Sequence, residues 1–260
     1  MITINRLFPP PVTAAAPERA VAGPTRFIRY AFMPNRLHFC GGDDNRTIFE
    51  YALAAVREPP LERMLAKFAG AVPYLKLIAH SNGIADPFDE RVVEAYWLGN
   101  ALLERVEVRD LYTSLRERYH RQVSPKIMDL IAGKAPAGAR PHHSFHVFDV
   151  WRNVDRLGGD VLATLDNCRI SWGRVLRVDG GELIVARQPL EIAGGKLVLG
   201  SEREERVMRQ LDGRGFADNA RPGDWVSLHW GWVCEVISPH QQCALAHWTA
   251  YHMKLASRTL

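Results

Sequence analysis

The spacing of apolar residues changes once, near residue 167, and this change constrains the fold more than any other feature of the chain. Before it, apolar residues recur at three- and four-residue steps, as in residues 61–82 and 91–106, which predicts amphipathic helices. After it, short runs rich in valine, isoleucine, leucine and tryptophan alternate with glycine-containing turns, which predicts the short strands of a small barrel. We therefore expect an α+β protein in which a mostly helical domain precedes a small antiparallel, OB-like β-barrel with a C-terminal helix.

The same change places the domain boundaries. Residues 1–24 contain a run of three prolines and an alanine-rich stretch, and we interpret them as a flexible leader. Residues 25–166 then form the expected helical domain. Residues 167–260 form the expected barrel, with a closing helix over 239–255.

Individual elements follow from the same spacing. Helices are expected over residues 46–56, 61–82, 91–106, 110–122 and 155–165. Pro73 should kink or divide the second of these, and Asp86 or Asp89 should cap the third. Strands are expected over residues 174–178, 182–187, 196–199, 203–208 and 225–237.

Composition excludes several classes of protein. The chain has 260 residues, a net charge of +4 and no block of basic residues, so nucleic-acid binding is not expected. No apolar run approaches the ~18 residues that a membrane span needs, and no charged segment precedes an apolar one as in a signal peptide. The four cysteines have no disulfide-scaffold or zinc spacing, which favours free thiols in the cytoplasm.

Two stretches of the C-terminal region share a pattern with a known family. In the first, Cys168 is followed five residues later by Gly173 and then by a β-branched strand, and this spacing predicts that Cys168 lies at the start of the first strand with an accessible sulfur. In the second, Gly223-Asp224 leads through an apolar run to His229-Trp230-Gly231-Trp232. Residues 167–260 thus resemble the hydrogenase-maturation chaperones of the HypC/HybG/HupF family. Two departures are that Cys168 is internal here and that a further hairpin is expected around residues 189–200.

The resemblance implies a function and a set of site residues. Members of that family carry an iron with cyanide and carbon monoxide ligands, together with the scaffold HypD, to the large subunit of nickel–iron hydrogenase. It implies Cys168 and His229 as iron ligands, and a HypD-like scaffold or a hydrogenase large subunit as partner. The partner-binding residues that it implies are Gly173, Trp230, Gly231 and Trp232.

The whole chain also resembles an uncharacterised bacterial family, DUF6390. The residues that carry this likeness are the stretch 92–97 with Gly99-Asn100, the stretch 142–148 and the strand segments above. This second resemblance brings no activity with it.

His142, His143 and His146 are the densest group of imidazoles in the chain. In a helix, His142 and His146 would lie one turn apart and could chelate one metal ion, whereas in a strand His142, Ser144 and His146 would share a face. Apolar neighbours also allow a purely structural role. We expect at least two of the three to face a common polar cavity, where His38, Cys40 or Glu94 could add a ligand.

These observations favour an accessory protein or chaperone of metallocentre assembly, with nickel–iron hydrogenase maturation as its most specific form. The alternative is an iron- or haem-binding enzyme that uses the histidine group, and an adaptor without metal stays open. No GxGxxG, Walker, GxSxG or CxxC motif supports nucleotide-cofactor, phosphoryl-transfer or serine-hydrolase chemistry.

Overall fold

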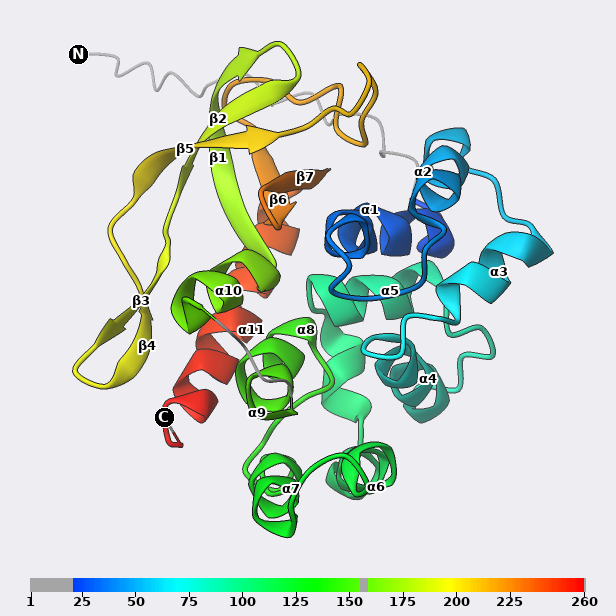
Figure 1. Ribbon diagram of the computed structural model, residues 1–260, viewed down its shortest axis with the longest axis vertical. Coiled ribbons are helices and arrows are strands. Elements are labelled where there is room, and N and C mark those ends of the chain that lie inside the picture. Colours follow the sequence, from blue (N-terminus) through cyan, green and yellow to red (C-terminus); the bar gives the residue numbers. More distant parts are fainter. Residues whose placement is uncertain (1–20, 155–158, 260) are drawn as a thin grey trace, which may run out of the picture.

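The computed structural model describes residues 21–154 and 159–259, and it has the expected α+β architecture. Helices fill the first part of the chain, a closed ring of strands follows, and a long helix ends it (Figure 1). The expected leader lies mostly outside the described residues, and the first helix already begins at Gly23. The expected helix over 155–165 also lies partly outside them; the described helix there is Val161–Cys168.

The helical region contains ten α-helices and two other helical segments within the described residues. They are α1 (Gly23–Arg36), α2 (Asn45–Ala54), α3 (Pro59–Leu65), α4 (Val72–Ser81), α5 (Glu90–Trp97), η1 (Ala101–Arg105), α6 (Val108–Tyr119), α7 (Pro125–Ala132), α8 (His143–Phe145), η2 (His146–Trp151), α9 (Arg152–Val154) and α10 (Val161–Cys168).

Two helices, α4 and α5, begin where Pro73 and Asp89 predict. Pro73 divides the apolar pattern of residues 61–82, since α3 ends at Leu65 and α4 begins with Pro73 in its first turn. Asp89 caps α5 by accepting a hydrogen bond from the backbone N–H of Arg91 at 2.9 Å. The predicted helix over 91–106 is shorter than expected, because the chain leaves α5 at Leu98 and Gly99, where φ is +93°, and then forms the 3₁₀ segment η1.

Seven strands follow in residues 159–259. They are β1 (Ser171–Asp179), β2 (Glu182–Arg187), β3 (Leu190–Ala193), β4 (Lys196–Leu199), β5 (Arg203–Met208), β6 (Trp225–His229) and β7 (Trp232–Ile237). Five of them close into a ring in the order β1-β2-β5-β7-β6, and β3 and β4 form the expected further hairpin beside it. The ring is mixed rather than wholly antiparallel, because β5 meets β7 in parallel through the pair Met208 and Trp232.

The single strand predicted over residues 225–237 is in fact a tight hairpin. β6 and β7 pair with His229 opposite Trp232, and the two residues of the turn have positive φ, +54° for Trp230 and +69° for Gly231. Two successive positive φ angles define the turn type that best matches strand twist. Tryptophan rarely adopts this conformation, so the continuous apolar run gave no sign of a turn.

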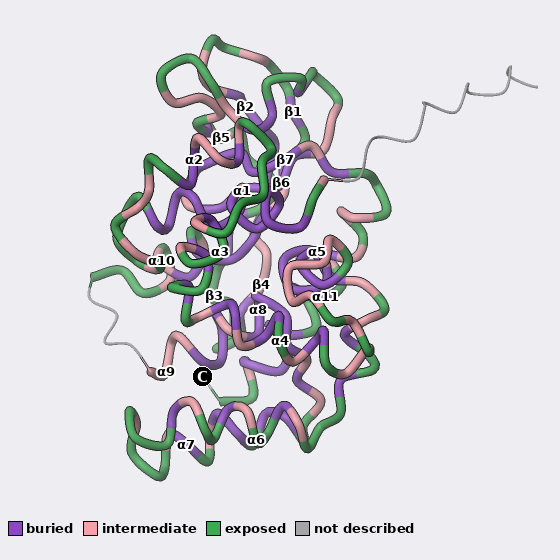
Figure 2. Tube along the Cα trace, turned by 90° about the vertical axis from the view of Figure 1, so that its right-hand side faces the viewer, coloured by how far each residue is buried: buried purple, intermediate pink, exposed green. Residues whose placement is uncertain are grey.

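The main hydrophobic core is formed by residues from both sides of residue 167, where the apolar pattern changes. Helix α1 packs on α5 and also on β6 and β7, and Phe32 of α1 contacts the buried Trp232 with ring centroids 5.1 Å apart. Figure 2 shows buried chain concentrated in α1, α5, α8 and the β6–β7 hairpin, whereas α6 and α7 carry more exposed residues. The division into two domains stays a prediction, but the site described next lies where the two regions meet. The closing helix α11 (Pro239–Ala256) begins with a capping box between Ser238 and Gln241.

Candidate metal centre

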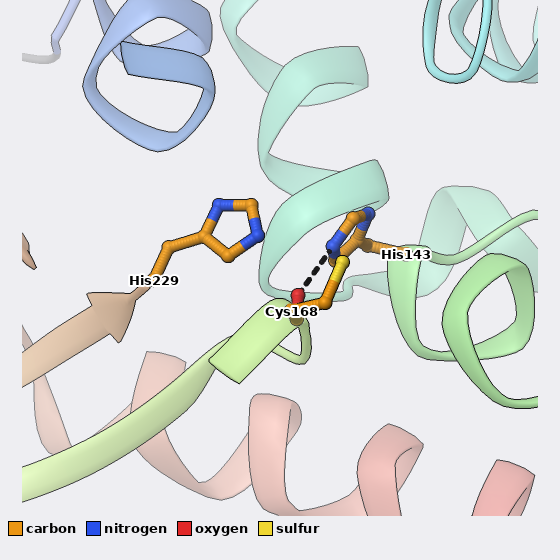
Figure 3. A group of neighbouring side chains, drawn as sticks. All are labelled: His143, Cys168 and His229. Carbon is orange, nitrogen blue, oxygen red and sulfur yellow. Dashed lines mark hydrogen bonds between the residues drawn. The ribbon is translucent and has the colours of Figure 1, made fainter. Parts of the chain in front are cut away.

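Three side chains from distant parts of the sequence meet in the interior. His143 begins α8, Cys168 ends α10, and His229 ends β6. One nitrogen of each imidazole and the cysteine sulfur all lie within 4.8 Å of one another. Figure 3 shows the two rings and the sulfur directed toward a common point. Two imidazoles and a thiolate are donors that zinc, iron and copper accept, so the three residues form a candidate metal site.

His229 is oriented for coordination by a backbone hydrogen bond. Its Nδ1–H donates to the carbonyl oxygen of Tyr30 in α1 at 2.6 Å, which leaves Nε2 without a proton. This Nε2 atom is buried and has no hydrogen-bond partner among the described residues. Burial lowers the pKa of His229 to about 4, so the ring is neutral at physiological pH. A carbonyl that fixes one nitrogen while the other carries a free lone pair is the usual support of a metal-ligating histidine.

His143 has a hydrogen bond at each ring nitrogen. Nε2 lies 2.9 Å from the carbonyl oxygen of Cys168, and Nδ1 lies 3.1 Å from the hydroxyl of Tyr96. In this geometry Nε2–H donates to the Cys168 carbonyl, and Nδ1 accepts from the Tyr96 hydroxyl. A tyrosine hydroxyl can also accept, so in the other tautomer Tyr96 would accept from Nδ1–H, and the Nε2 lone pair would be free for a metal ion in place of the hydrogen bond to Cys168. Burial lowers the pKa of His143 well below its usual value, which keeps one nitrogen unprotonated in either tautomer.

Cys168 is a buried thiol with 9% of its surface exposed. Burial, with a smaller contribution from Cys40, raises its pKa well above the usual value, so the sulfur is protonated in the metal-free protein. A metal ion reverses this preference because it stabilises the thiolate directly. The expectation that Cys168 starts the first strand was wrong: it is the last residue of α10, and β1 begins three residues later at Ser171.

A buried ionic network holds the end of α10 against the strands. Arg169, which is 1% exposed, donates from Nε to Asp166 at 2.8 Å and from Nη2 to the carbonyl of Gln188 at 2.6 Å. Arg187 of β2 donates to the same Asp166 carboxylate at 2.6 Å. The backbone around Cys168 is therefore fixed to β2 and to the segment that follows it.

The tip of the β6–β7 hairpin is held to the same helix end. The backbone N–H of Trp230 donates to the carbonyl of Asn167 at 2.9 Å, which places His229 beside Cys168. The Trp230 ring stacks on Phe39 with centroids 4.0 Å apart and an interplanar angle of 17°. These two contacts offset the strain of a tryptophan at φ +54°.

The three candidate ligands line one wall of a cavity of about 540 Å³. Aromatic residues form much of its lining. Further polar side chains also reach it, and they include Arg118 of α6, His146 of the π-helical turn η2, Cys40 of the loop after α1, Lys67 and Gln122. A site with three protein ligands beside such a space has room for an additional ligand on the metal.

The comparisons with known proteins give one match. The model of a protein family, described as a family of unknown function (DUF6390), matches residues 19–260. The chain belongs to the DUF6390 family. No curated protein and no solved structure matches it. These results do not connect residues 167–260 with the HypC-like chaperones, so that likeness stays a prediction.

For this DUF6390 protein, the structure joins two sites that the sequence analysis kept apart. Cys168 and His229 were expected as an iron site, and His142, His143 and His146 as a second site in the helical region. Instead His143 completes the first site, and His146 lies in the same cavity. Burial lowers the pKa of His146 to about 3.

His142 lies elsewhere, although it is adjacent to His143. It has extended backbone angles and caps α8 by accepting from the backbone N–H of Ser144, so its ring points toward α11. Of the additional ligands considered, Cys40 lines the cavity, whereas Glu94 pairs with Arg26 at 2.8 Å and His38 is exposed. Glu94 and His38 are therefore not ligands of this site.

Burial shows which of the expected partner-binding residues could contact a partner. Trp232 is 0% exposed, in the core against Phe32, and Gly173 is buried within β1 against Val185, so neither presents a surface to a partner. Trp230 is half-buried and Gly231 is exposed at the hairpin tip. None of the helices in residues 21–154 and 159–259 is long and apolar enough to cross a membrane.

Two residues that the geometry makes important had no signal in the sequence. Tyr30 supplies a backbone carbonyl, which no side-chain pattern can reveal. Arg118 is one of many arginines in a charged helix, and only the fold distinguishes it from its exposed neighbours.

Proposed function

We propose that this chain binds an iron ion through His143, Cys168 and His229 and acts as an accessory protein of metallocentre assembly. The observation that carries the proposal is the unpartnered Nε2 of His229, held by the carbonyl of Tyr30 beside a cysteine sulfur and a second imidazole. Leaving a buried lone pair without a partner costs about 1–3 kcal/mol, which a bound metal ion would recover.

The donor set supports a transition metal rather than magnesium or calcium, which prefer oxygen ligands. Three protein ligands leave coordination positions open toward the cavity, and a carrier needs such positions to hold and release its cargo. The two residues that the HypC-like resemblance implies, Cys168 and His229, are both in this site. Maturation of nickel–iron hydrogenase, with an iron that carries cyanide and carbonyl ligands, is therefore the most specific form of the proposal.

A metalloenzyme is the second candidate, and the size of the cavity favours it. A volume of about 540 Å³ exceeds what one ion needs and lies within the range of small-molecule sites. In that case the metal would act on a substrate bound in the same cavity.

Metal analysis of the full chain tests the proposal. Protein expressed anaerobically with iron should contain close to one iron per chain. Cys168→Ser and His229→Gln should each remove it, whereas Cys243→Ser, which changes an exposed thiol on α11, should retain it. Protein without metal under these conditions, or Cys168→Ser protein with its full metal content, would exclude the site.

Infrared spectroscopy separates the two candidate functions. Cyanide and carbonyl stretching bands in protein expressed together with a hydrogenase-maturation system, and their loss in Cys168→Ser, would support the carrier. Iron without these bands, together with no binding to a hydrogenase large subunit, would favour the enzyme.

A further inference from the structure

The cavity beside the candidate metal site contains an arginine, Arg118, that has no carboxylate partner among the described residues. The Arg118 guanidinium lies over the ring of Tyr74, with Cζ 4.4 Å from the centroid, and its Nη2 donates to the hydroxyl of Tyr119 at 2.8 Å. Nη2 also lies 3.3 Å and 3.4 Å from the carbonyls of Ala69 and Gly70. Nη1 is buried and has no hydrogen-bond partner among the described residues.

The described lining of the cavity has an excess of positive charge. Its described lining includes Arg118 and Lys67 but no aspartate or glutamate. Lys67 is already paired with Asp44 at 2.6 Å, at an exposed position. Arg118 is therefore the described lining residue whose positive charge is not already paired with a carboxylate. A partly buried cation without a counter-ion is unfavourable, and a bound anion would remove this cost.

A second unpartnered polar group belongs to a residue that lines the same cavity. The Nδ1 atom of His146 is buried and has no partner among the described residues. The His146 ring lies 6.1 Å from His143 and 5.7 Å from Tyr74, measured between centroids. The polar groups along this wall therefore run from the candidate metal ligands through His146 to Arg118.

We propose that this cavity binds a small monocarboxylate, with Arg118 Nη1 donating to the carboxylate and His146 supplying a second hydrogen bond. One unpaired guanidinium edge matches one negative charge, and the aromatic lining suits an apolar body rather than a phosphate. Placing the far end of this ligand next to a metal ion depends on the proposed function, whereas the carboxylate site itself does not.

Titration of the full-length, metal-free protein with acetate, benzoate and phosphate tests the site. Tryptophan fluorescence is a suitable signal because Trp97 and Trp151 line the cavity. Acetate or benzoate should bind at millimolar concentration or tighter, and more tightly than phosphate. Arg118→Gln should weaken carboxylate binding by about tenfold or more, since it removes a charge-assisted hydrogen bond. Arg121→Gln, which changes an exposed arginine just beyond the same helix, should leave it unchanged.

Further variants keep the result interpretable. Arg118→Lys retains the charge and should bind carboxylate better than Arg118→Gln, which separates loss of the site from general unfolding. Cys168→Ser should still bind acetate in the metal-free state, so failure of the metal proposal would not remove this result. Equal binding by wild type and Arg118→Gln, or preference for phosphate, would overturn the inference. In cobalt-loaded protein, acetate should also change the visible spectrum; binding without such a change would overturn the placement beside the metal.

Discussion

Two groups of buried histidines lie on either side of α8, and they differ in what their ring nitrogens face. In the first group, His143 and His229 meet Cys168 at the wall of a cavity. In the second, His142 and His252 are bridged by the Ser144 hydroxyl, at 2.7 Å and 2.8 Å from their Nδ1 atoms. Burial lowers the pKa of the imidazoles in both groups.

The comparison shows that burial and a lowered pKa do not by themselves mark a functional histidine. In the second group, the backbone N–H of Arg140 donates to Nε2 of His252, and Ser144 connects the two rings, while Nε2 of His142 is buried without a hydrogen-bond partner among the described residues. It has no thiol and lies outside the cavity. The first group leaves Nε2 of His229 unpartnered next to a sulfur. Each group has one unpartnered ring nitrogen, so the adjacent thiol and the cavity, rather than the number of imidazoles, separate the candidate site from the structural network.

Acid should affect both groups, and this is the largest effect that we expect. The pKa values of His142 and His146 are lowered to about 3, and that of His229 to about 4, whereas unfolded histidine titrates near 6.5. As the pH falls below about 6.5, the unfolded state takes up protons that the folded state cannot. Stability is therefore fully present above that pH, and each histidine removes roughly 1.4 kcal/mol of it per pH unit until its folded pKa is reached.

Urea unfolding at about pH 7.5 and about pH 5.5 measures this loss, which should be on the order of 5 kcal/mol for the buried histidines together. Cobalt should sharpen the comparison, because under the proposed function it would bind only the first group. It should raise the free energy of unfolding at the higher pH, and the gain should vanish in acid as protons compete for its ligands. Equal stability at the two pH values would mean that the imidazoles are not buried as neutral rings.

Cys168→Ser should separate the two groups most clearly. Replacing a thiolate with a hydroxyl removes the soft ligand, so cobalt affinity should fall by more than about 100-fold, beyond the 10–100-fold typical of a supporting residue. The sulfur-to-cobalt charge-transfer band should disappear with it. Stability without metal should change little, since serine fits the same space. A variant that keeps the band would assign the sulfur ligand to Cys40 instead.

Tyr96→Phe tests whether the tyrosine hydroxyl orients His143. Without it, Nδ1 of His143 loses its partner at 3.1 Å, and the tautomer with Nε2–H on the Cys168 carbonyl becomes favoured. We expect cobalt affinity to fall about 10–100-fold while the charge-transfer band is retained at saturation. Tyr51→Phe serves as the control, at a half-buried position on α2 that is distant from Tyr96 in the sequence. It should bind cobalt as tightly as the wild type. Unchanged affinity in Tyr96→Phe would leave the Cys168 carbonyl as the partner of His143 in the metal-bound state.

Local patterns predicted α2 to α6 and most strands, because spacing and turn residues are local properties, but they did not single out α1 or α7. Asp89 and Pro73 set helix starts as their chemistry requires. The hairpin at Trp230 and Gly231 could not be predicted in this way. Its turn depends on stacking with Phe39 and on a hydrogen bond to Asn167, contacts between segments far apart in the sequence.

The candidate site was predictable in its residues but not in its grouping. Cys168, His229 and His143 were each singled out by a motif or by local density. Their convergence depends on how the hairpin tip, the end of α10 and the start of α8 pack together, which is tertiary information. The opposite directions of His142 and His143 follow from the extended backbone at His142 just before a helix start, and a helical or strand spacing rule would not produce this.

Ser144→Ala is the smallest change that should separate the two groups, and it affects only the second. Removing the hydroxyl leaves Nδ1 of His252 without its partner at 2.8 Å, so the free energy of unfolding should fall by about 1–3 kcal/mol. Cobalt affinity should be unchanged, because Ser144 does not line the cavity. Ser201→Ala, at an exposed position between β4 and β5, should change neither quantity. If Ser144→Ala weakened cobalt binding as much as Tyr96→Phe, the two groups would be one coupled network through α8, and the distinction between a structural and a metal-binding histidine would not hold in this protein.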